Sequence, residues 1–75
     1  MQINDAIIYA TRKLNYSNSK RIDSEVLLCS VLKCNRIKLY TYPEQKLSNT
    51  VQQAFKKLVE KRSKGYPVAY LTKQK

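Results

Sequence analysis

Apolar residues recur at intervals of three and four positions along most of this chain, and this spacing limits the folds open to it. The pattern is clearest after Ser48, where the apolar positions are Val51, Ala54, Phe55, Leu58 and Val59. Such spacing places the side chains on one face of an α-helix. Ser48 is a favourable residue for the start of that helix. Gly65 is well placed to end it in a left-handed conformation.

Two further helices are predicted in the first half of the chain. The first has its apolar stripe at Ile3, Ile7, Ala10 and Leu14, with Asn4 or Asp5 at its start. A polar loop follows over residues 15–20. The second helix is expected from near Ser19 to about Lys33. Its apolar residues cover more than one side, which is typical of the central, most buried helix of a bundle.

Two shorter helices are predicted in the second half. Asn35 is expected to cap a helix that runs to about Tyr40, with Ile37 and Tyr40 on one face. The segment 42–44 contains Pro43 and stops this helix, because the residue before proline disfavours helical backbone. Pro67 is expected to open a short last helix.

These segments together predict an all-α fold, a small bundle of four to five helices. The chain has one glycine and two prolines in 75 residues, too few for an all-β fold with many hairpins. The bundle is expected over residues 1–65, followed by a short helix and linker over residues 66–75.

Catalytic, cofactor-binding and metal-ligating residues are not expected in this chain. Histidine, the usual general base and metal ligand, is absent. Asp23 and Glu25 are two positions apart, so on a helix they point about 200° away from each other and cannot act as an acid and base pair. There is no glycine-rich phosphate-binding loop.

The two cysteines, Cys29 and Cys34, do not match a redox or metal-binding motif. On one helix their Cα atoms would lie about 8.5 Å apart, too far for a disulfide. We therefore expect buried free thiols in a reducing cytoplasm. No segment approaches the length of a membrane span, and no export signal is evident.

The chain carries a formal charge of +10, from 15 basic and 5 acidic residues. Lysine, asparagine, isoleucine and tyrosine are plentiful, and all have A/T-rich codons, so genome composition is expected to account for part of the excess. The remainder is suited to attracting an acidic protein or a nucleic acid.

Two stretches, taken together, resemble a known family. The first is RIDSEVLL over residues 21–28, and the second is KRSKGYPVAYLT over residues 61–72. Pro43-Glu44 and Leu47-Ser48 lie between them in the matching order. This set resembles the N-terminal helical domain of the HemK/PrmC family, the release-factor glutamine methyltransferases. The chain departs from the family pattern at Tyr66, usually acidic, and at Lys73, usually glycine.

The resemblance implies that the chain is the substrate-docking part of a larger enzyme and is not catalytic itself. In that family, a domain that binds S-adenosylmethionine follows, with an N-P-P-Y motif, and methylates the glutamine of the Gly-Gly-Gln motif in peptide-chain release factors. The implied partners are a release factor and the methyltransferase domain of the same chain, toward which residues 66–75 would lead. S-adenosylmethionine would bind the parent enzyme only.

The motif residues are assigned structural roles. Arg62 is predicted to pair with Asp23 or Glu25 and so to tie the fourth helix to the second. Gly65 and Pro67 are expected to end one helix and start the next, and Tyr70 and Leu71 to pack under the junction. The exposed basic residues predicted to contact a partner are Arg12, Arg36, Lys38, Lys57 and Lys61.

Two other functions stay open from the sequence. One is an autonomous small basic helical protein that binds nucleic acid, for which the dense run of lysines over residues 56–64 is the main argument. The other is a structural bundle that forms oligomers. Coding sequence beyond Lys75 with an N-P-P-Y motif would favour the methyltransferase.

Overall fold

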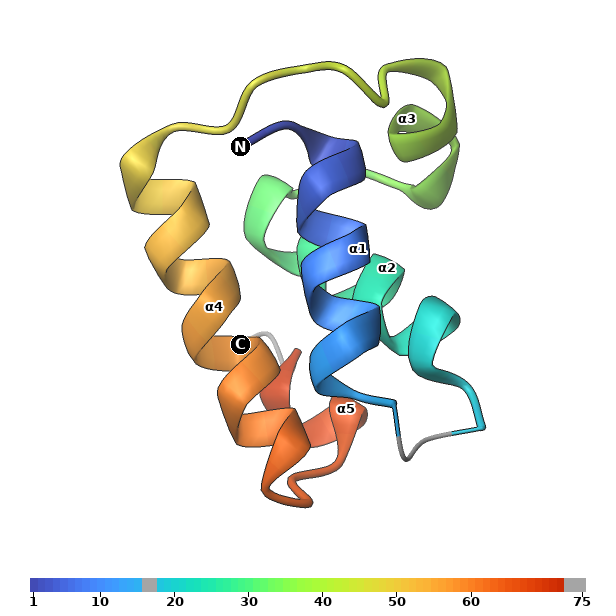
Figure 1. Cartoon of the computed structure of the whole chain (residues 1–75), viewed down its shortest axis with the longest axis vertical. Coiled ribbons are helices and arrows are strands. Elements are labelled where there is room, and N and C mark those ends of the chain that lie inside the picture. The colour runs from blue at the N-terminus through green and yellow to red at the C-terminus, as the bar shows by residue number, and fades with distance from the viewer. Residues whose placement is uncertain (16–17, 73–75) are drawn as a thin grey trace.

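A computed structural model describes residues 1–15 and 18–72 of the chain. It confirms the all-α bundle, and Figure 1 shows the helices wrapped around one core. Within the described residues there is no β-strand, and no helix is long and apolar enough to cross a membrane. The helices are α1 (Ile3–Lys13), α2 (Lys20–Leu32), α3 (Arg36–Thr41), α4 (Asn49–Ser63) and α5 (Val68–Leu71).

The start of α1 differs from the sequence-based expectation. The helix begins at Ile3, and Asp5 lies inside its first turn, where its carboxylate accepts a hydrogen bond of 3.0 Å from the backbone N–H of Gln2. The N–H groups of Ile3 and Asn4 donate to backbone carbonyls in the segment 43–45, which passes beside the N-terminus in Figure 1. This segment satisfies donors that a helix start leaves without intrahelical partners, so tertiary contacts set the helix start.

The core is formed mainly by one face each of α1, α2 and α4. The predicted stripe of α1 is confirmed, since Ile3, Ile7, Ala10 and Leu14 are all buried. α2 lies at the centre and contacts each of the other helices, as its broad apolar surface predicted. One edge of α2 is an exception, because Ile22 is 51% exposed. The remaining core residues are Ala6, Leu27, Leu28, Leu39, Leu47, Phe55 and Val59.

α3 is a short helix whose caps match the expectation. The side chain of Asn35 accepts a hydrogen bond from the backbone N–H of Lys38. Only one apolar side chain of this helix reaches the core, that of Leu39. Ile37 and Tyr40 are 69% and 55% exposed, so neither is part of the apolar core.

The end of α4 is fixed by backbone geometry. Gly65 has a φ of +103°, and its N–H donates to the carbonyl of Arg62, while the N–H of Tyr66 donates to that of Lys61. This pair of bonds is the Schellman motif that ends many helices. Pro67 then caps α5, as expected.

Tyr70 does not occupy the place that the sequence suggested. Its side chain is 65% exposed and packs beside Tyr66, with the ring centroids 5.9 Å apart. The other predicted residue, Leu71, does pack against the core, together with Val68. A helix of four residues has too little periodicity to show which side faces inward. α5 contacts α2 and α4, and the expected linker over residues 73–75 lies outside the described residues.

The expectation of buried thiols is wrong. Cys29 and Cys34 are free but only partly buried. α2 ends at Leu32, and Lys33 adopts a left-handed backbone with a φ of 57°, so Cys34 does not lie on the helix. The turn brings the N–H of Cys34 to the carbonyl of Cys29, at 3.2 Å. The helical spacing assumed for the two cysteines therefore does not apply.

Candidate functional site

Asp23 and Arg62 join the second helix to the fourth. Nη2 and Nε of Arg62 donate to Oδ2 of Asp23, at 3.1 and 3.2 Å. The side chain of Asp23 is 11% exposed and that of Arg62 is 20% exposed. The hydroxyl of Ser19 also donates to the Asp23 carboxylate. The predicted pairing of Arg62 is thus present, with Asp23 as its partner, and these groups hold helices together.

Glu25 is a buried carboxylate between α2 and α3. Its side chain is 2% exposed, and it accepts hydrogen bonds of 2.8 Å from the Tyr40 hydroxyl and 3.0 Å from Nε of Arg36. Arg21, one helical turn earlier, lies 3.2 Å from its other oxygen. A buried charge is tolerated when it is paired and hydrogen-bonded, and Glu25 meets both conditions. The contacts of Tyr40 and Arg36 with Glu25 were not predicted from the sequence, because both residues lie on a different helix from Glu25.

The five basic residues predicted to contact a partner are all exposed, but the structure distributes them over different helices. Arg12 is on α1, and Lys57 and Lys61 are on α4. Arg36 and Lys38 are on α3, which packs on α2. Arg36 also pairs with Glu25 inside the molecule. The predicted set is therefore divided among three helices.

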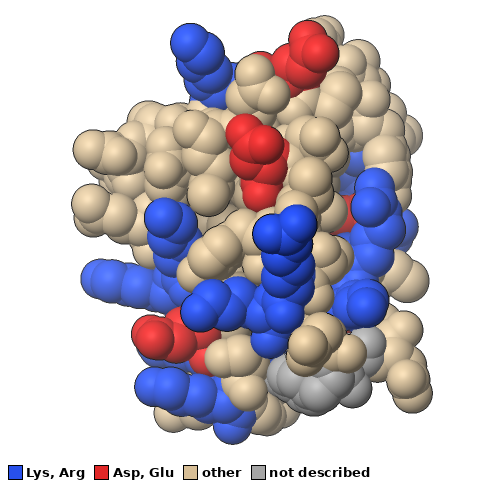
Figure 2. Space-filling model, in the orientation of Figure 1, with Lys and Arg blue, Asp and Glu red and all other residues tan. Residues whose placement is uncertain are grey.

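A different set of basic residues gathers between α1 and α4. The side chains there line a hollow of about 300 Å³, which we name the Tyr9 cleft; its lining includes Tyr9, Lys13, Lys56, Lys57, Glu60 and Lys64. Figure 2 shows Lys and Arg side chains crowded over the half of this face where α1 and α4 end. Of the five residues predicted from the sequence, Lys57 is the one in this cleft.

Tyr9 is at the centre of this arrangement. Its ring is partly buried against the core. The ammonium groups of Lys13 and Lys56 lie 5.8 and 5.6 Å from the ring centroid, within the range of cation–π attraction. The ring therefore positions one lysine from each helix. The four-residue spacing of Tyr9 and Lys13 was a signal in the sequence, but the approach of Lys56 depends on how α4 packs.

The chemistry available at the cleft is the binding of anions. Four lysines stand against one glutamate there. Among the described residues all three ion pairs involve an arginine, and none involves a lysine of the cleft or Glu60. Lysine is a flexible point charge that suits carboxylates and phosphates in many geometries. In the part of the chain that the structure describes, no group of three His, Cys, Asp or Glu side chains is arranged to hold a metal ion.

Comparison with known proteins identifies the family. The model of the PrmC N-terminal domain matches residues 5–72. A release factor glutamine methyltransferase from Leptospira interrogans is 42% identical over 57 residues, which cover 76% of this chain and 20% of the relative. The one from Coxiella burnetii is 42% identical over 59 residues, or 79% of this chain and 21% of the relative.

A third relative aligns with the whole chain. The release factor glutamine methyltransferase from Buchnera aphidicola is 36% identical over all 75 residues, which is 27% of the length of the relative. No solved structure gives a significant match. The chain thus spans only about a fifth to a quarter of the length of these relatives. It belongs to the PrmC N-terminal domain family.

Proposed function

We propose that this member of the PrmC N-terminal domain family docks the protein substrate of a release factor glutamine methyltransferase. In this proposal the chain holds a peptide-chain release factor in the cytoplasm, while a separate domain methylates the glutamine of the Gly-Gly-Gln motif. The observation that carries the proposal is the family match over residues 5–72, together with relatives that are all named release factor glutamine methyltransferase.

The roles of the acidic residues support docking over catalysis. Asp23 is paired with Arg62, and Glu25 is held by Arg36 and Tyr40. Both carboxylates are occupied in joining helices, as a scaffold requires. Methyl transfer to one glutamine of a large protein needs remote contacts that fix the orientation of the substrate. A rigid helical unit with an exposed basic face is suited to supply such contacts.

S-adenosylmethionine does not fit the described residues. Nucleotide-like cofactors are commonly held by a glycine-rich turn at a helix start, with an acidic residue on the ribose. The one glycine here, Gly65, ends α4, and neither hollow beside Tyr9 contains a glycine. We therefore assign the cofactor to the methyltransferase domain of the parent enzyme.

Nucleic-acid binding is the second candidate, and the lysines of the Tyr9 cleft are the observation in its favour. The two functions differ in how strongly salt weakens binding and in whether the release factor is needed for binding. Binding to nucleic acid would be independent of the release factor and would fall steeply with salt.

A kinetic experiment tests the docking proposal. Removing the domain from the parent methyltransferase should raise the KM for the intact release factor by about tenfold or more, because docking contacts act on the whole protein. Methylation of a short peptide with the Gly-Gly-Gln motif should change little. An unchanged KM for the intact release factor would refute the proposal.

A further inference from the structure

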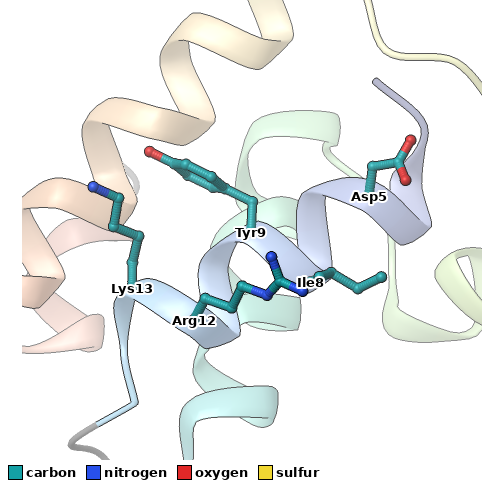
Figure 3. Close-up of a pocket in the computed structure, with 5 residues that line it drawn as sticks. All are labelled: Asp5, Ile8, Tyr9, Arg12 and Lys13. Atoms are coloured by element: carbon teal, nitrogen blue, oxygen red, sulfur yellow. The ribbon is translucent and has the colours of Figure 1, made fainter.

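The Tyr9 cleft has a second hollow beside it, on the outer side of α1. This second hollow is about 380 Å³ and is lined by Asp5, Ile8, Tyr9, Arg12 and Lys13. Figure 3 shows Tyr9 and Lys13 reaching toward α4, while Arg12 and Ile8 lie along the outer side of α1. Tyr9 and Lys13 line both hollows and form the boundary between them.

The two hollows differ in chemistry. The Tyr9 cleft carries a net charge of +3 at pH 7, from four lysines and one glutamate. The second hollow presents an apolar side chain, Ile8, which is 43% exposed although it is large and hydrophobic. The exposed Ile8 and the lysines beside it together suit a protein partner, since apolar contact adds affinity and charge gives orientation.

The positions of the acidic residues bear on which partner fits. Glu60 lines the Tyr9 cleft and Asp5 lines the second hollow. A nucleic acid places a phosphate at every step, so a carboxylate in each hollow would repel part of a strand laid across both. A folded protein segment carries separate acidic and apolar side chains, which can be placed on the lysines and on Ile8 while avoiding the two carboxylates.

We infer that the Tyr9 cleft and the hollow beside Ile8 together bind an acidic, amphipathic segment of the release factor. This inference rests on the proposed function, and it assigns that function to one face of the domain. Carboxylates of the segment bind among Lys13, Lys56 and Lys57, and an apolar side chain covers Ile8. The basic residues of α3 contribute only to the long-range field.

The test is a binding measurement with variants of equal charge. The 75-residue chain is titrated with the purified release factor, and the dissociation constant is measured by calorimetry at several salt concentrations. One variant is Lys56→Glu with Lys57→Glu, in the cleft. Its control is Lys20→Glu with Lys46→Glu, at two exposed positions at the start of α2 and in the connection before α4. Circular dichroism checks that both variants keep their helix content.

The cleft variant should bind the release factor at least about tenfold more weakly, and the control should stay within about threefold of the original chain. Equal weakening by both variants would overturn the inference, since net charge alone would then explain binding. It would also be overturned if a 20-residue polyuridine RNA bound more tightly than the release factor and only the cleft variant lost the RNA. An original chain that does not bind the release factor at all would instead refute the proposed function.

Discussion

Arg62, in the last turn of α4, donates two hydrogen bonds to a single carboxylate oxygen of Asp23, in the first turn of α2. The two residues are 39 positions apart in the chain. The negative charge also suits the start of a helix, and the positive charge suits the end of one. This contact fixes the spacing of the two helices at the end of the bundle where α5 packs on both.

Replacing Arg62 with methionine should lower the free energy of unfolding by about 2–3 kcal/mol, because it leaves Asp23 largely buried without its cation. Urea unfolding followed by circular dichroism measures the change. The control is Arg21→Met, which removes a 66% exposed partner of Glu25 and should cost less than about 1 kcal/mol. Equal effects of the two substitutions would show that the Asp23 pair contributes no more than a surface pair.

Tyr40→Phe should lower the free energy of unfolding by about 1–2 kcal/mol. The Tyr40 hydroxyl donates to both oxygens of the buried Glu25, and its loss removes a hydrogen bond to a charged group. Tyr42→Phe is the matched control, since Tyr42 is 56% exposed and a surface change of this kind should alter stability by less than about 0.5 kcal/mol. The same urea measurement applies, and no difference between the variants would contradict the role of Tyr40.

Lys33→Gly should raise the free energy of unfolding by about 1 kcal/mol, because Lys33 adopts a left-handed backbone that glycine takes at no steric cost. At Gly65, which has a φ of +103°, the change to alanine should lower stability by a similar amount. An added Cβ there meets nothing within 4 Å, so the cost would come from the backbone alone. Lys64→Ala, at a φ of −90°, is the neutral control. Thermal or urea unfolding of the variants measures all three effects.

The stability of the protein should depend on the Cys29 thiol above about pH 9. Burial, together with the neighbouring Cys34, raises the pKa of Cys29 from 9.0 to about 11. Well below pH 9 the thiol is protonated in the folded and unfolded chains alike. Between pH 9 and about 11 the unfolded chain releases the proton and the folded chain keeps it, so the free energy of unfolding falls.

The measurement compares the original chain with Cys29→Ala by urea unfolding at pH 8 and pH 10.5. All other titratable groups are present in both proteins, so the difference between the two proteins isolates Cys29. The stability of the original chain relative to the variant should decrease at the higher pH. A difference that does not change with pH would contradict the raised pKa.

The helices were predictable from the sequence because periodicity and capping are local properties. The stripe of α1, the cap at Ser48, the end of α4 at Gly65 and the start of α5 at Pro67 agree with the prediction. The start of α1 at Ile3 was not predictable in this way, since its first N–H groups are satisfied by a segment 40 positions later. The left-handed turn at Lys33 was not predictable either, because a glycine, the residue that usually marks such a turn, is absent there.

The candidate site was only partly predictable because it depends on how helices pack. The sequence analysis predicted Lys57 as an exposed basic residue, but the approach of Lys56 to Tyr9 follows from the placement of α4 against α1. The choice of Asp23 over Glu25 as the partner of Arg62 likewise depends on which side of α2 faces α4. Side chains two positions apart on a helix face different neighbours, and here Glu25 faces α3.

The most direct test of the docking function is competition. The 75-residue chain, added in excess to an active release factor glutamine methyltransferase, should inhibit methylation of the intact release factor competitively. It should leave methylation of a short Gly-Gly-Gln peptide unchanged, because the peptide has no docking segment. Absence of inhibition at concentrations that saturate the release factor, or equal inhibition of both substrates, would contradict a docking role for this domain.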